Sequence, residues 1–265
     1  MSDKKNIIDY VTVKNLLLYS ILIYKIDHNH EEKNLKKLLN SDLFKEEENI
    51  TENLNNLDNN DYLLDYFYCD ITHMYSFIIK NDIHKYIKII FRGSSENLHM
   101  IYNLKIKQRK ITFLEDNNIK IHSGFYQQIF KGKLYHNIKN YLKNIENIED
   151  YLIYCSGHSL GGIMATLFGY FSSYVFKNNK IAIISFGSSK IGNQSFKESF
   201  NKKENIICYR FYNKSDLVTQ LPPIINYEHV GFPVKLNTNN NNIYLNLLGE
   251  HGYNSYFNNL LYDTW

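Results

Sequence analysis

The residue whose surroundings point most clearly to chemistry is Ser159, in the segment Gly157-His158-Ser159-Leu160-Gly161. A serine hydroxyl becomes a strong nucleophile when a base removes its proton and nearby donors stabilise the oxyanion that its attack creates. The Gly-x-Ser-x-Gly spacing is typical of such serines. A glycine-rich turn whose serine only caps a helix has the same spacing, so the flanking sequence has to decide between the two.

The sequence on either side of Ser159 predicts a buried strand before it and a packed helix after it, because residues 151–155 and 163–170 are apolar runs. A turn this tight brings strand and helix so close that side chains at positions 157 and 161 would collide. The serine then stands at a helix N-terminus, where free N–H groups stabilise negative charge. This arrangement is typical of the nucleophile elbow of the α/β-hydrolase fold.

A catalytic serine needs a histidine base and a carboxylate that orients the histidine. In α/β-hydrolases the acid and then the base follow the serine along the chain. Asp216 follows an apolar run, and His251 lies in a loop flanked by glycines. We therefore expect Ser159, Asp216 and His251 to form a catalytic triad.

Other residues compete for these roles. His229 is the main rival base, but it falls within an expected strand, where a histidine usually has a structural partner. His158 is next to the serine and its side chain should point away from the hydroxyl, and His122 precedes the elbow in a turn. Asp263 follows every candidate base in the chain, so Asp216 is the better acid.

An acyl-transfer serine also needs two hydrogen-bond donors aimed at the oxyanion. We expect the first to be the backbone N–H of Leu160, the residue after the nucleophile. The second should come from the loop after an early strand, and Ser94 lies there in the segment Phe91-Arg92-Gly93-Ser94-Ser95. An Arg-Gly-Ser turn is common by itself, so the assignment of Ser94 depends on its place in the chain.

The stretch after Ser94 predicts a short amphipathic helix, because Leu98, Ile101 and Tyr102 stand at i, i+3 and i+4. Two interpretations remain open. The helix either closes onto the core in the ordinary way or forms a lid at residues 95–104, which would hide apolar surface until lipid is present.

Apolar runs alternate with helical segments along most of the chain, which predicts an α/β fold with a mostly parallel sheet covered by helices on both faces. Functional residues then gather where the strands end. The expected strands are residues 66–71, 75–80, 84–91, 151–155, 180–186, 206–212, 227–236 and 243–248, with a hairpin over 109–122. The expected helices are residues 5–26, 124–145, 163–170 and 193–200, and a segment at the C-terminal end. We expect one domain over 1–265, with residues 1–60 as an N-terminal helix and polar elaboration.

Composition limits the class of protein. The chain has 265 residues, a net charge of +3 and 44% hydrophobic residues. It has no long basic block, so nucleic-acid binding is not indicated. Its three cysteines lack framework spacing, which favours reduced, buried thiols. No stretch approaches the roughly 20 apolar residues of a membrane span, and the apolar run 16–24 lacks the cleavage site of a secretion signal. These features leave the location cytoplasmic or unknown.

In six ordered blocks the chain resembles the class 3 lipases, the fungal-type triacylglycerol lipase family of the α/β-hydrolase fold. The blocks are Ile89–Ser94, Ile121–Phe125, Gly157–Gly162, Ser185–Gly187 with Ile191–Asn193, Asp216–Val218 with Leu221–Pro223, and His251 with Tyr256. Blocks in a fixed order are far more specific than any single motif. The resemblance implies the same triad and oxyanion residues, the lid at 95–104, and neither a cofactor nor a metal.

Two loops depart from the family pattern. Ser188-Ser189-Lys190 stands where a Pro-Arg pair is common, and Val218-Thr219-Gln220 stands where Val-Pro is usual. Both departures affect the shape of a loop near the acyl pocket and leave the triad intact.

We interpret the chain as a serine carboxylester hydrolase of the lipase type that cleaves acylglycerol esters through an acyl-enzyme. Its partners would be the lipid ester and, transiently, a lipid interface at the lid. Alternatives within enzymes are phospholipase A1, a monoacylglycerol or diacylglycerol lipase, and a non-lipid esterase. An alternative of another class is a catalytically silent interaction protein of the same fold.

Overall fold

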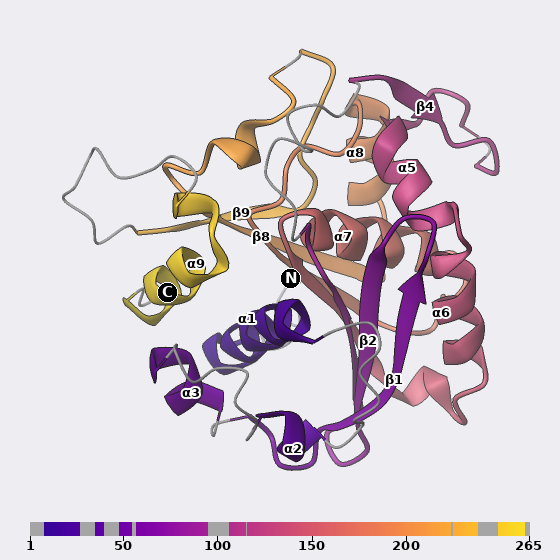
Figure 1. Ribbon diagram of the computed structural model, residues 1–265. Helices are drawn as coiled ribbons and strands as arrows, with labels where there is room; N and C mark the ends of the chain where they lie inside the picture. The colour runs from indigo at the N-terminus through magenta and orange to yellow at the C-terminus, as the bar shows by residue number, and fades with distance from the viewer. Residues whose placement is uncertain are drawn as a thin grey trace.

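Among the residues that the structure describes, seven strands form the central sheet, in the spatial order β1-β2-β3-β6-β7-β8-β9 (Figure 1). The computed structural model describes residues 8–26, 35–39, 48–54, 57–94, 106–114, 116–223, 225–237 and 249–262. The strands of this sheet are Tyr62–Cys69 (β1), Met74–Asn81 (β2), Tyr86–Phe91 (β3), Leu152–His158 (β6), Ile181–Phe186 (β7), Ile206–Asn213 (β8) and Phe232–Leu236 (β9). A separate hairpin joins Gln108–Lys110 (β4) to Lys120–His122 (β5).

Five neighbouring strands, β3, β6, β7, β8 and β9, are parallel, whereas β1 and β2 extend the sheet antiparallel. The ends of the parallel strands are aligned, because Phe91 pairs with Gly157 and Phe186 pairs with both His158 and Phe211. Segments that follow these strands therefore meet at one edge of the sheet. The structure confirms the predicted mostly parallel sheet.

Helices cover both faces of the sheet (Figure 1). One face carries α1 (Tyr10–Lys25) and α9 (Tyr253–Tyr262), and the short helices α2 (Leu35–Leu39) and α3 (Glu48–Leu54) lie on the same side. The other face carries α5 (Ser123–Phe130), α6 (Leu134–Lys143), α7 (Leu160–Ser172) and α8 (Gln194–Asn201). The described residues also include the short 3-10 turns η2 (Ile148–Asp150), η3 (Leu217–Gln220) and η4 (Gly249–His251).

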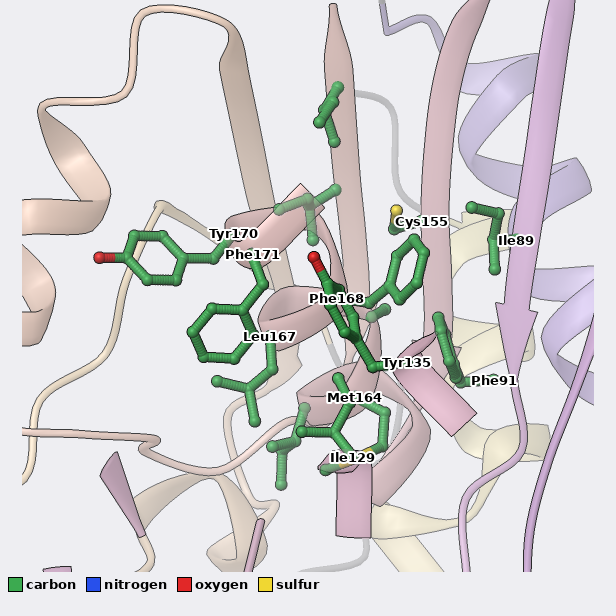
Figure 2. Close-up of a cluster of buried hydrophobic side chains, with 14 of the residues drawn as sticks. Ile89, Phe91, Ile129, Tyr135, Cys155, Met164, Leu167, Phe168, Tyr170 and Phe171 are labelled. Atoms are coloured by element: carbon green, nitrogen blue, oxygen red, sulfur yellow. The ribbon is translucent and has the colours of Figure 1, made fainter. Parts of the chain in front are cut away.

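An apolar core lies on each face of the sheet, so the central strands are buried on both sides and consist of continuous apolar runs. On the α7 side, the ring of Phe168 packs 5.5 Å from the rings of both Phe91 and Tyr135 (Figure 2). On the α1 side, the helix buries one residue after another from Leu16 to Ile23. The two cores hold strand β6 between them, and this also fixes the position of the turn that follows β6.

The predicted helix over 124–145 is wrong, because the chain forms α5 and α6 with a break between them. Gly132 and Lys133 have left-handed φ angles of +83° and +65°. A Cβ at position 132 would lie 2.0 Å from the Sγ of Cys69, so the chain turns where it packs against the end of β1. The predicted strand over 227–236 is also too long, because β9 begins only at Phe232.

Other expectations have mixed outcomes. The three cysteines are buried and free, as predicted. None of the helices in the described ranges has the length and apolar character needed to cross a membrane. The expected lid at 95–104, the expected strand at 243–248 and the rival acid Asp263 lie outside the described residues.

Candidate active site

Ser159 occupies the turn between β6 and α7 with a strained backbone. Its φ of +57° and ψ of −125° are a combination that residues other than glycine rarely adopt. A Cβ at Gly157 would lie 2.4 Å from the carbonyl carbon of Gly161, and one at Gly161 would lie 2.2 Å from the carbonyl oxygen of Phe91. The structure thus has the close approach that the sequence predicts, and both positions require glycine.

A continuous line of hydrogen bonds joins Ser159, His251 and Asp216. The Oγ of Ser159 lies 2.8 Å from Nε2 of His251, and Nδ1 of His251 lies 2.9 Å from Oδ2 of Asp216. All three residues are buried. A carboxylate only accepts hydrogen bonds, so Nδ1 carries the proton and Nε2 presents its lone pair to the serine hydroxyl. The structure brings together the three residues predicted as a triad.

The Asp216 carboxylate is held by more than the histidine. Its Oδ1 accepts a hydrogen bond of 2.9 Å from the backbone N–H of Val218, and its Oδ2 accepts one of 2.6 Å from the hydroxyl of Tyr256. That hydroxyl in turn accepts from the N–H of Asn213 at 3.2 Å. Burial and the adjacent carboxylate raise the pKa of Tyr256 well above its ordinary value, so the hydroxyl stays protonated and keeps donating.

Both residues expected to supply oxyanion donors lie at the same edge of the sheet. Leu160 is the first residue of α7, so its N–H has no acceptor within the helix. Ser94 follows β3 and is half-buried. The loop before Ser94 packs against the elbow, because a Cβ at Gly93 would lie 2.6 Å from the carbonyl oxygen of His158. The oxyanion role of these residues remains a prediction.

Comparison with known proteins identifies the family. The sequence profile of the family described as lipase (class 3) matches residues 88–226, more than half of the chain. The chain belongs to the class 3 lipase family. The matched segment contains the β3 loop, the elbow and the Asp216 loop, and it ends before His251. The membership confirms the resemblance stated from the ordered blocks.

Curated relatives of the chain match over shorter stretches. Toxin TseL of Vibrio cholerae is 31% identical over 111 residues, which are 39% of this chain and 15% of the toxin. The chloroplastic phospholipase A(1) DAD1 of Arabidopsis thaliana is 34% identical over 71 residues, or 26% of this chain and 16% of that protein. The chain therefore spans less than half of the length of these relatives.

Solved lipase structures share the fold of the chain. Lip2 lipase from Yarrowia lipolytica superposes with a TM-score of 0.67 and 17% identity, covering 87% of this chain and 80% of Lip2. The lipase from Rhizopus microsporus var. chinensis gives a TM-score of 0.65 and 21% identity, covering 85% of this chain and 74% of that lipase. At these identities the likeness establishes the α/β-hydrolase fold.

The rival histidines of the chain have structural partners. Nε2 of His229 lies 2.8 Å from the carbonyl oxygen of Thr219, and burial with the charge of Arg210 lowers the pKa of His229 to about 3. Nδ1 of His122 accepts from the N–H of Gly124 at 3.1 Å, and burial lowers the pKa of His122 to about 4. The hydrogen bonds that these two imidazoles form in the described part of the chain are thus with backbone groups and not with Ser159.

The two loops that depart from the family pattern lie beside the site. Ser188 and Ser189 are buried, and the hydroxyl of Ser188 lies 3.1 Å from that of Ser185. The N–H of Lys190 donates to the carbonyl of Leu221 at 2.8 Å, so the two departing loops contact each other. Within the described ranges, no cluster of three or more His, Cys, Asp or Glu side chains is arranged to hold a metal ion.

Sequence reasoning missed two tyrosines that contact the site. The sequence places Tyr256 in a family block but gives no sign of its hydrogen bond to Asp216. Nothing in the sequence distinguishes Tyr24, whose hydroxyl lies 3.0 Å from Nδ1 of His158. The short spacing between His251 and Tyr256 was the signal that could have indicated a contact of Tyr256 with the site. For Tyr24, the sequence shows only that it belongs to an apolar helix.

Proposed function

We propose that the chain is a serine carboxylester hydrolase of the lipase type, acting through an acyl-enzyme formed on Ser159. The observation that carries the proposal is the hydrogen-bonded line from Ser159 through His251 to Asp216, with distances of 2.8 Å and 2.9 Å. Membership of the class 3 lipase family supports it. The strained backbone at Ser159 is a further support, because such strain persists where function requires it.

The mechanism follows from the donor and acceptor atoms. Nε2 of His251 takes the proton of Ser159 while Oγ bonds to the ester carbonyl carbon, and the N–H of Leu160 with the donors of Ser94 stabilises the oxyanion. The intermediate collapses, and the departing alkoxide takes the proton from His251. Water then attacks the acyl-serine with His251 again as base, which releases the carboxylic acid and restores the serine.

We propose an acylglycerol as the substrate. Phospholipase A1 activity is the second candidate, because several curated relatives carry that name, among them phospholipase A1-IIbeta of Arabidopsis thaliana, 29% identical over 114 residues. Contact of the 95–104 stretch with a lipid interface is part of the proposal. Hydrolysis assays with triacylglycerol, monoacylglycerol and phosphatidylcholine, and with a short soluble ester, separate the candidates by rate.

The decisive experiment is labelling with a fluorophosphonate probe, which reacts covalently with activated serines. We expect the wild type to be labelled and Ser159→Ala to be neither labelled nor active, with turnover lowered about 10⁶-fold. Ser156→Ala is the matched control, because Ser156 is a buried serine on β6, the strand that leads to Ser159, and its hydroxyl faces that of Ser20 at 3.3 Å. Labelling of Ser159→Ala would show that another serine is the activated one and would overturn the assignment of Ser159. No labelling of the wild type, even with detergent present, would make the silent-protein alternative the better one.

A further inference from the structure

Beyond the triad, a second line of hydrogen bonds starts on the N-terminal helix and ends at the backbone of the base. The hydroxyl of Tyr24, in the last turn of α1, lies 3.0 Å from Nδ1 of His158. Nε2 of the same imidazole lies 2.6 Å from the carbonyl oxygen of His251. The histidine next to the nucleophile thus contacts the residue that carries the base.

The direction of the hydrogen bonds in this line is fixed by chemistry. A carbonyl oxygen only accepts, so Nε2 of His158 carries the proton. Burial and the neighbouring His251 lower the pKa of His158 to about 3, so the ring is neutral and Nδ1 has a lone pair. That lone pair accepts from the hydroxyl of Tyr24, whose own pKa is raised by burial. Every polar atom of the imidazole is therefore used.

The Tyr24 hydroxyl also touches the loop that leads to Ser94. A Cβ at Gly93 would lie 1.9 Å from this hydroxyl oxygen and 2.6 Å from the carbonyl oxygen of His158. The hydroxyl therefore fills the space that a side chain at position 93 would need. It stands where the β3 loop, the elbow and the helix α1 come together.

The residue at the end of the line needs this support. His251 belongs to η4, a single 3-10 turn, and not to a long element. The turn is held from the other side by the Nδ2 of Asn213, which donates to the carbonyl of Glu250 at 2.8 Å. The hydrogen bond from His158 to the His251 carbonyl is the second fixed point, and it acts on the base itself.

We propose that Tyr24 and His158 are positioning residues that fix the backbone of His251, so that the N-terminal helix controls the geometry of the catalytic base. The proposal rests on the proposed function, because it assigns a role relative to the base of that reaction. Neither residue touches the substrate in this role. A displacement of the imidazole of His251 by less than 1 Å weakens proton transfer from Ser159 and leaves substrate binding in place.

If Tyr24 only stabilised the fold, its substitution would affect turnover no more than that of a comparable buried tyrosine. The chain contains such a tyrosine, which serves as a matched control. Tyr19 lies on the same helix, is fully buried, and donates its hydroxyl to Oδ2 of Asp61 at 2.8 Å. Tyr19→Phe removes one buried hydrogen bond of α1 on the side away from the active site. If α1 only contributes stability, Tyr24→Phe and Tyr19→Phe will have the same effect on turnover.

The test compares kcat and KM for a soluble ester in the full chain. We expect Tyr24→Phe to lower kcat about tenfold with KM unchanged, and Tyr19→Phe to leave both unchanged. In a His158→Phe background, Tyr24→Phe should have no further effect on kcat, because the line is already broken.

The two proposals fail in different ways. A wild type that neither turns over ester nor reacts with the fluorophosphonate would contradict the proposed function, and this inference with it. A wild type that is active, with equal kcat in Tyr24→Phe, would overturn the positioning role alone. Additive losses in the double variant would also overturn it, since independent effects need no line through His158.

Discussion

At the scale of single residues, the Asp216 carboxylate shows how a buried charge is held in one orientation. Val218 N–H, His251 Nδ1–H and the Tyr256 hydroxyl all donate to it, at 2.9 Å, 2.9 Å and 2.6 Å. Tyr256 and His251 share the same oxygen, Oδ2. The position of Tyr256 therefore limits how far this oxygen can move relative to the imidazole, which gives the tyrosine an influence on the base.

Tyr256→Phe should lower both activity and stability. We expect kcat to fall about tenfold and the free energy of unfolding to fall by about 1.5 to 3 kcal/mol, because a hydrogen bond to a buried charged group is lost. Measurements of kcat and urea unfolding check both numbers. Tyr170→Phe is the control: its hydroxyl contacts Ser199 at 2.6 Å on the far side of α7, so kcat should not change. Full kcat in Tyr256→Phe would contradict the expectation.

The sequence indicated the three residues of the triad. It could not indicate the tyrosines whose hydroxyl groups hold the triad in place. Ser159, Asp216 and His251 differ in type from their surroundings and follow a fixed order, so few alternatives existed. Tyr24 and Tyr256 are two of 23 tyrosines. Their hydroxyl contacts arise from tertiary packing between segments far apart in the chain, and no local spacing records such contacts.

At the scale of elements, the sequence was most informative where one element is buried on all sides. The apolar runs before and after Ser159 and at 180–186 and 206–212 became β6, α7, β7 and β8 with small changes in their ends. The helix over 124–145 failed because a single glycine in a helical pattern does not by itself end a helix. Its break depends on the contact between Gly132 and Cys69, which is 63 positions away in sequence.

Two glycines of α7 provide an element-scale prediction. A Cβ at Gly161 would meet the backbone of β3, 2.2 Å from the carbonyl oxygen of Phe91, whereas one at Gly169 would meet the end of the Ile183 side chain at 2.6 Å. Backbone cannot move without shifting the sheet, but a side chain can rotate.

Gly161→Ala should therefore reduce the free energy of unfolding by about 3 kcal/mol or more. Gly169→Ala should change it by within about 1 kcal/mol, because the better helix propensity of alanine offsets the repacking. Urea unfolding of both variants gives the comparison. Equal losses of unfolding free energy in the two variants would contradict this prediction. They would show that β3 and α7 can move further apart at the elbow than the distances indicate.

At the scale of the whole molecule, several histidines are folded in their neutral form. Burial lowers the pKa of His122 to about 4, and of His158 and His229 to about 3, from an ordinary value near 6.5. His122 is the last residue of β5, His158 is the last residue of β6, and His229 lies just before β9. The fold thus buries three imidazoles that must stay uncharged, which makes it sensitive to acid.

The sign of this sensitivity follows from proton binding. Between pH 6.5 and about 4 the unfolded chain binds protons at these positions and the folded chain does not, so the free energy of unfolding falls as the pH falls. Each such histidine contributes at most about 1.4 kcal/mol per pH unit in this window. Carboxylates with lowered pKa values add a loss only at lower pH, near and below their ordinary value of about 4.

His229→Gln isolates one of these contributions. The pKa of His229 is lowered by burial and by the charges of Arg210, Lys190 and Lys197. A glutamine can still donate to the carbonyl of Thr219 while carrying no titratable proton. We expect the slope of unfolding free energy against pH, measured by urea unfolding between pH 6.5 and 4.5, to become smaller by about 1 kcal/mol per unit. His136→Gln, at an exposed position of α6, is the control and should change the slope far less. An unchanged slope in His229→Gln would mean that His229 is protonated in the fold, which its burial and these positive charges disfavour.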